Sequence, residues 1–194
     1  MNQVYDAAQE IHVLFGERGW DFCIIGGLAI IRWGRVRVTE HVDVSLLTGI
    51  GDEREFLDII AARFPGREPD EVQFALGARV YRGFASSGAP IDIALAAFPF
   101  EEDVIRRAKP YEYRPGCVVN TCSANDLVVM KAFAGREIDM YDVKYLVSNQ
   151  WDHLNWEQIE RDLQNLCDWT ERFEPLPRLI ELREQIRHIK QTEG

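Results

Sequence analysis

Apolar residues recur at helical spacing near both ends of the chain. In residues 4–16 they fall every three or four positions, as on the buried face of a helix that Gly16 can end. The segment 176–190 carries a similar stripe, and residues 138–149 and 155–167 have the same periodicity. The pattern therefore predicts one helix at the start and a series of helices at the end.

Short apolar runs, rich in β-branched residues, predict strands between these ends. The predicted strands are DFCII (21–25), VDVSLL (42–47), two short strands around Gly77 in 71–84, PIDIALAAF (90–98) and two small strands around a turn in 111–119. Helices are predicted at 28–34, 52–63, 100–108 and from Ser123, which can cap its helix with Asp126 three residues on.

Strands early in the chain and helices late in it predict an α/β (α+β) fold, a mixed sheet flanked by helices. We expect a core of residues 1–122 that carries the sheet, and a C-terminal helical part, residues 123–194, packed on that core.

Composition narrows the classes of function. The chain of 194 residues has a formal net charge of −10, which disfavours a whole-surface grip on nucleic acid, although Arg32, Arg35 and Arg37 form a local basic group. The first residues lack the basic region of a signal peptide, and no apolar run approaches the roughly 20 residues of a membrane span. The four cysteines follow no metal or disulfide spacing, so we expect a reduced, cytoplasmic setting without membrane contact.

Candidate chemistry follows the first predicted strand. Gly26 and Gly27 end that strand and open a helix, where backbone N–H groups can approach phosphate closely. Residues two apart on a strand share a face, so His41 and Asp43 point the same way, and Asp92 on a later strand can face them. Carboxylates so arranged can hold two divalent ions about 3.5–4 Å apart.

A second group of charged residues lies in the C-terminal part. Lys131 and Arg136 can supply positive charge to a departing pyrophosphate. Asp139 and Asp142, three apart on a helix, share a face and can orient either cation or the nucleotide.

Two stretches carry a resemblance to a known family. FCIIGGLAIIRWGRVRVTEHVDVSLLTG resembles the first signature of the AbiEii/AbiGii toxin family, within the DNA polymerase β-like nucleotidyltransferase superfamily. SANDLVVMKAFAGREIDMYDVKYL resembles its second signature, and PIDIALAAFPFEE matches the segment with the third carboxylate. The similarity runs from about Tyr5 to beyond Leu146.

The resemblance implies a nucleotidyltransferase that uses Mg²⁺ or Mn²⁺ and a nucleoside triphosphate. The acceptors it implies include RNA such as tRNA ends, and several family members are toxins neutralised by an antitoxin protein. The resemblance implies that Gly26 and Gly27 hold the triphosphate, that Asp43 and Asp92 bind metal, that Lys131 contacts phosphate, and that Asp139 or Asp142 supports catalysis. As further nucleotide contacts we predict Arg37, Thr39 and Arg136.

The chain departs from the family at one position. The family reads D-x-D where this chain reads His41-Val42-Asp43, so the first carboxylate of the pair is missing. His41 can ligate a softer ion such as manganese or zinc, since magnesium prefers oxygen. Glu40 can replace the carboxylate only if a bulge turns it to the same face. In the third alternative the chain has lost transfer chemistry and is a nucleotide- or protein-binding module.

Overall fold

The computed structural model describes residues 2–34 and 38–193. The chain divides into two compact units. Unit 1 comprises Met1–Arg32 and Arg37–Cys122, and unit 2 comprises Trp33–Val36 and Ser123–Gly194.

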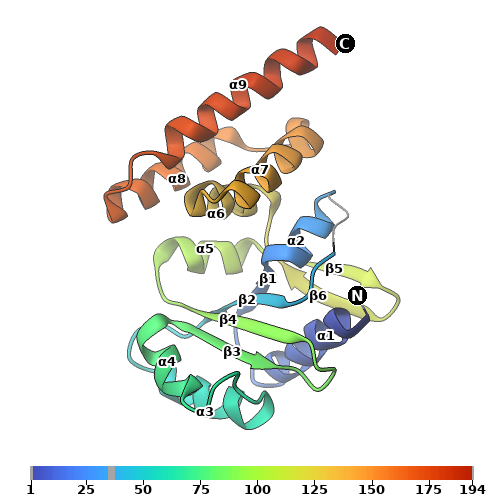
Figure 1. Ribbon diagram of the computed structural model, residues 1–194, viewed down its shortest axis with the longest axis vertical. Helices are drawn as coiled ribbons and strands as arrows, with labels where there is room; N and C mark the ends of the chain where they lie inside the picture. The colour runs from blue at the N-terminus through green and yellow to red at the C-terminus, as the bar shows by residue number, and fades with distance from the viewer. Residues whose placement is uncertain (1, 35–37, 194) are drawn as a thin grey trace. The chain divides into compact units, whose positions relative to one another are not determined.

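Unit 1 is built on a mixed six-stranded sheet in the order β3-β4-β2-β1-β6-β5 (Figure 1). Its strands are β1 (Phe22–Ile25), β2 (Val42–Leu47), β3 (Val80–Phe84), β4 (Pro90–Ala96), β5 (Lys109–Arg114) and β6 (Cys117–Thr121). Its helices are α1 (Asn2–Glu17), α2 (Gly26–Arg32), α3 (Glu53–Arg63), α4 (Glu71–Ala78) and α5 (Pro99–Arg107). Strand β2 is antiparallel to β1 and parallel to β4. The predicted mixed sheet flanked by helices is confirmed.

The main hydrophobic core lies on the face of the sheet covered by α1, α3 and α4 (Figure 1). The side chains of Val42, Val44 and Leu46 are buried in it. Since side chains alternate along a strand, Asp43 between them points to the opposite face, where α2 and α5 lie (Figure 1). Burial of Val42, Val44 and Leu46 on one face thus fixes the direction of the Asp43 carboxylate.

Residues 71–84 do not form the predicted pair of strands. The first half is helix α4, and only Val80–Phe84 is a strand. Glu71 and Ala75, four residues apart, are the buried positions of α4, which is a helical spacing. The first helix also ends later than predicted, at Glu17, and the left-handed glycine that follows it is Gly19 rather than Gly16.

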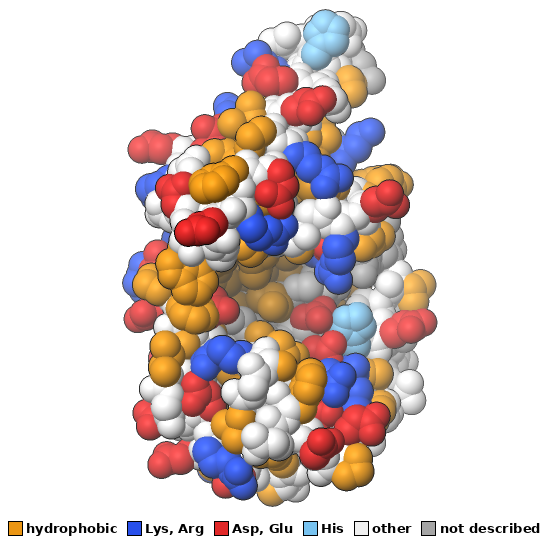
Figure 2. Space-filling model, turned by 60° about the vertical axis from the view of Figure 1, so that its left-hand side comes forward, with side chains coloured by type: hydrophobic (Ala, Val, Ile, Leu, Met, Phe, Trp, Pro, Cys, Tyr) orange, Lys and Arg blue, Asp and Glu red, His pale blue; other side chains and the backbone are white. Residues whose placement is uncertain are grey.

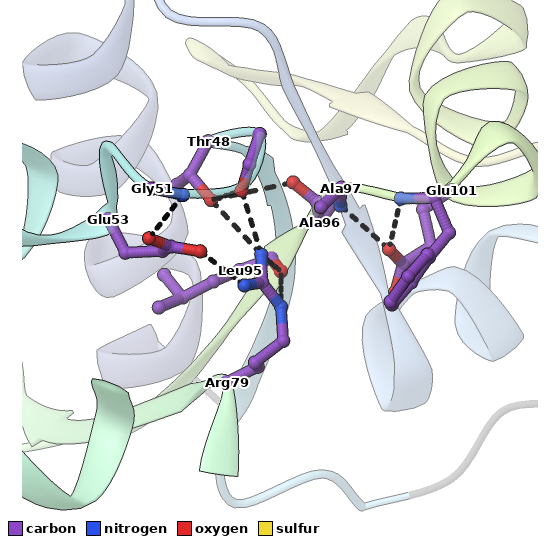
Figure 3. A network of polar contacts seen from close by, with 10 residues as sticks. Thr48, Gly51, Glu53, Arg79, Leu95, Ala96, Ala97 and Glu101 are labelled. Atoms are coloured by element: carbon purple, nitrogen blue, oxygen red, sulfur yellow. Dashed lines mark hydrogen bonds and ion pairs between the residues drawn. The ribbon is translucent and has the colours of Figure 1, made fainter. Parts of the chain in front are cut away.

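Arg79 ends α4 and ties three segments together (Figure 3). It has the left-handed φ of 56° and donates to the carbonyl oxygens of Leu95 and Gly49, and it forms an ion pair with Glu53. These contacts hold the ends of β2 and β4 together. Glu101 accepts from the backbone N–H groups of Ala97 and Phe98 and so fixes the start of α5 (Figure 3).

The described part of unit 2 is helical. Its elements are α6 (Ala124–Ala134), α7 (Glu137–Gln150), the 3₁₀ turn η1 (Trp151–His153), α8 (Trp156–Thr170) and α9 (Pro175–Glu193). The predicted cap of α6 is confirmed, because the Ser123 hydroxyl accepts from the backbone N–H of Asp126 at 3.1 Å. Across the described ranges, no helix is both long and apolar enough to traverse a lipid bilayer.

Candidate active site

The pairing of β2 with β4 brings two carboxylates together. In this parallel ladder Asp43 lies directly opposite Asp92, so both side chains stand on the same face of the sheet. Each is partly buried. The two acids proposed from sequence therefore converge, although 49 positions separate their numbers along the chain.

His41 completes this group. Its Nε2 lies 3.2 Å from Asp43 Oδ1, and ligand atoms of His41, Asp43 and Asp92 lie within 4.8 Å of one another. We call these three residues the cation cluster. Glu40 is exposed and is not part of it.

Gly26 lies against the same carboxylate. The Gly27 N–H donates to Asp43 Oδ2 at 3.2 Å, and Gly26 has a φ of +59°. A Cβ on Gly26 would lie 1.9 Å from Asp43 Oδ2, so only glycine fits this close approach. The double glycine thus shapes the cation cluster by positioning Asp43.

Arg67 is a member of the site that sequence reasoning missed. Its Nη2 donates to Asp92 Oδ1 at 2.5 Å, and both side chains are 30% exposed. Arg67 comes from the loop between α3 and α4, in a stretch without a motif.

Burial and neighbouring charges shift two pKa values in the cluster. Burial raises the pKa of Asp92, and the nearby Asp43 carboxylate raises it further, against the effect of Arg67. The hydrogen bond to Asp43 raises the pKa of His41, although burial acts in the opposite direction. A cation would be favoured here, because it relieves the repulsion between the two carboxylates.

The donor set fits a divalent ion. Two neighbouring ligands held about 2.1 Å from one ion lie roughly 3.0–3.4 Å apart, and His41 Nε2 and Asp43 Oδ1 are separated by 3.2 Å. One imidazole with two carboxylates suits manganese or zinc better than magnesium, which prefers oxygen.

Thr39, the other predicted nucleotide contact of unit 1 that lies within the described residues, is not part of the cation cluster. Thr39 is buried, and its hydroxyl donates to the carbonyl oxygen of His41 at 3.2 Å. Thr39 therefore supports the segment that carries His41. Arg37, also predicted as a nucleotide contact, lies outside the described residues.

The remaining predicted residues form an ion-pair cluster within unit 2. Asp139 and Asp142 are fully buried, and Lys131 Nζ lies 2.7 Å from Asp139 Oδ1 and 3.3 Å from Asp142 Oδ2. Arg136 also donates to Asp139. Burial opposes ionisation of Asp139, but the hydrogen bonds from Arg136 and Lys131 outweigh it and hold its pKa below the ordinary value. These contacts link the C-terminal turn of α6 to the first two turns of α7.

Comparison with solved structures identifies the fold. The chain aligns with the solution structure of the antibiotic-resistance factor ANT(2'')-Ia at 16% identity and a TM-score of 0.57, over 86% of this chain and 92% of that one. It aligns with a nucleotidyltransferase-like protein from Paracoccidioides brasiliensis at 14% identity and a TM-score of 0.53, over 94% and 93% of the two chains. ANT(2'')-Ia in complex with adenylyl-2''-tobramycin gives 16% identity and a TM-score of 0.55, over 88% and 99%.

The chain has the nucleotidyltransferase fold. No family model matches the sequence, and no curated protein matches it. The resemblance to the AbiEii/AbiGii toxin family therefore stays a prediction from the two sequence signatures.

Proposed function

We propose that this protein transfers a nucleotide from a nucleoside triphosphate to a hydroxyl acceptor, with a divalent cation held by His41, Asp43 and Asp92. The observation that carries the proposal is the convergence of these three side chains beside the Gly26–Gly27 bend. The fold shared with ANT(2'')-Ia supports it.

The proposed reaction is a displacement at the α-phosphorus. The acceptor oxygen forms a bond to this phosphorus, the bond to the pyrophosphate oxygen breaks, and the hydroxyl proton passes to solvent. A bound divalent ion would lower the pKa of the hydroxyl and offset charge on the phosphates. Asp43 and Asp92 would hold the ion, and Gly26 leaves room for Asp43 at the end of β1.

The acceptor that we propose first is an RNA end such as that of a tRNA, as the sequence resemblance implies. A toxin neutralised by an antitoxin partner would fit the same activity. A small polyhydroxyl acceptor is the other choice, because one structure with this fold contains adenylyl-2''-tobramycin. We further propose that Lys131 contacts phosphate and that Asp139 and Asp142 support it, as their ion pairs allow.

The test is transfer of label from each nucleoside triphosphate in turn, with Mg²⁺ or Mn²⁺, to tRNA and to an aminoglycoside. We expect the wild-type protein to transfer label with Mn²⁺ and the Asp43→Asn variant to lose at least a hundredfold in rate. Asp58→Asn, an exposed aspartate on α3, is the matched control and should retain full activity. Equal rates for Asp43→Asn and the wild type would contradict the proposal.

A second candidate function is suggested by His41 itself. If imidazole at this position has removed transfer chemistry, the protein is a nucleotide- or protein-binding module. In that case wild-type protein transfers no label with either ion, whereas His41→Asp gains transfer with Mg²⁺. Wild-type activity with Mn²⁺ excludes this alternative.

A further inference from the structure

We propose that the cation cluster binds one divalent ion rather than two, and that the Arg67 guanidinium supplies the charge that a second ion would otherwise provide. This inference rests on the proposed function, since it concerns the same site. It is carried by the position of Arg67 beside Asp92 and by the number of acidic ligands.

The sheet edge holds Arg67 in place. The loop before α4 forms an isolated bridge between Gly66 and Gly83, and the Arg67 N–H donates to the Arg82 carbonyl oxygen at 3.0 Å. A Cβ on Gly83 would lie 2.9 Å from the Pro65 carbonyl oxygen, so the loop can approach β3 this closely only at a glycine. Arg67 is therefore fixed through its backbone.

A buried carboxylate stabilises the strand against which this loop lies. Glu71 is 2% exposed and accepts from both the backbone N–H and the side chain of Arg82. In the β3–β4 ladder Arg82 lies opposite Asp92. The Arg82 guanidinium forms its ion pair with Glu71. The guanidinium that directly contacts Asp92 is therefore that of Arg67.

Charge balance then favours a single ion. A two-metal site built from three carboxylates and two divalent ions carries a net charge of +1. Here two carboxylates, one guanidinium and one divalent ion also give +1 when His41 is neutral, as a metal ligand must be. A second divalent ion would raise the net charge to +3 beside a fixed guanidinium.

The number of protein atoms that can coordinate an ion also favours a single ion. Asp92 already accepts from Arg67 with Oδ1, and Asp43 accepts from Gly27 with Oδ2. Each carboxylate has two oxygens, so each can still offer one to an ion. With His41 Nε2 these make three ligands, which is enough for one open site, whereas an ion about 3.5–4 Å away would have to share the oxygens that already accept from Arg67 and Gly27.

The test counts Mn²⁺ on the full-length protein by electron paramagnetic resonance and calorimetry, alone and with a non-hydrolysable analogue of each nucleoside triphosphate. We expect one Mn²⁺ in the cluster of the wild type, with the spectrum of an isolated ion. Arg67→Met should bind this ion at least tenfold more tightly and take up a second one, which gives a spin-coupled spectrum. Arg67→Lys keeps the charge and should bind only one ion.

Arg54→Met, an exposed arginine on α3, is the matched control and should behave as the wild type. A spin-coupled pair in the wild type, or an Arg67→Met variant with unchanged affinity and count, would overturn the inference. The wild-type count decides it even if Arg67→Met does not fold. One bound Mn²⁺ without any label transfer would overturn the proposed function and leave this inference standing, whereas absence of Mn²⁺ binding would overturn both.

Discussion

At Gly26 the geometry of the site depends on the absence of one atom, the Cβ that would collide with the Asp43 carboxylate. The glycine pair could be found in the sequence, but its partner could not, because the contact with Asp43 joins residues 17 positions apart. Periodicity and strand alternation likewise placed His41 and Asp43 on one face. The guanidinium of Arg67 escaped prediction, since nothing in its neighbours distinguishes it from a surface arginine.

Replacing Gly26 with alanine should damage both the fold and the cation cluster. The left-handed backbone costs an alanine about 1–2 kcal/mol, and the new methyl group must displace the Asp43 carboxylate. We expect a loss of at least 2 kcal/mol in the free energy of unfolding, measured in urea, and weaker Mn²⁺ binding by calorimetry. Gly16→Ala on α1, where a Cβ meets no atom within 4 Å, is the control and should not destabilise the protein.

At the scale of elements, the register of β2 with β4 is what brings Asp43 and Asp92 together in the candidate site. Both strands could be predicted from their apolar runs, and a face shared by Asp43 and Asp92 could be inferred. Their direct opposition could not, because it depends on which strands become neighbours. The missed helix α4 had a local cause, since it is only 8 residues long, contains Gly77, and buries Glu71, which looks exposed in sequence.

Glu71→Gln should destabilise the edge of the sheet in a pH-dependent way. Burial opposes ionisation of Glu71, but the hydrogen bonds from Arg82 outweigh it and lower its pKa below 4.5. Its stabilising effect is therefore complete above pH 4.5 and is lost as the pH falls through the lower, folded-state pKa. We expect the variant to lose about 1.5–3 kcal/mol at pH 7 and the difference to shrink in acid.

Thermal unfolding from pH 7 down to pH 3 measures this effect. Glu68→Gln, an exposed glutamate three residues away, serves as the control and should leave the curve unchanged. A Glu71→Gln penalty that stays constant over this range would refute the assignment.

The ion pairs between α6 and α7 make a separate prediction. Lys131→Met leaves two buried carboxylates with less compensation, so we expect a loss of about 3–5 kcal/mol in unfolding free energy. Adding Asp139→Asn and Asp142→Asn should recover part of this loss. Tryptophan fluorescence in urea reports it through Trp151 and Trp156, and Lys144→Met on the exposed side of α7 is the control.

The Lys131→Met variant and the triple variant, which adds Asp139→Asn and Asp142→Asn, together also test the proposed catalytic role of Lys131. If the triple variant folds as stably as the wild type and still transfers label at the wild-type rate, Lys131 is structural alone. A transfer rate that falls while Mn²⁺ binding and stability are restored supports contact of Lys131 with phosphate.

The predicted packing of the C-terminal helices on the core stays a prediction.

For the whole molecule, charge bears on the choice of acceptor. Acidic and basic side chains are interspersed over the face seen in Figure 2, and the formal net charge is −10. A protein that neutralises six or more phosphates loses roughly a thousandfold in affinity between 50 and 200 mM salt. We expect the Kd for labelled tRNA, measured by fluorescence anisotropy, to change by less than about threefold over this range. A steep loss of affinity with salt would instead indicate a basic surface that contacts the tRNA phosphates.

The ladder between β2 and β4 has a consequence for how the protein matures. A polypeptide that has emerged from the ribosome only as far as Pro90 lacks Asp92, so it holds His41 and Asp43 but no complete coordination sphere. If the proposed ion binds, its capture would wait for a long-range strand pairing, one of the slower events in folding. An ion that bound only the finished sheet would stabilise the folded chain by mass action, so that stability would fall with the concentration of the free ion even while the site stayed mostly occupied.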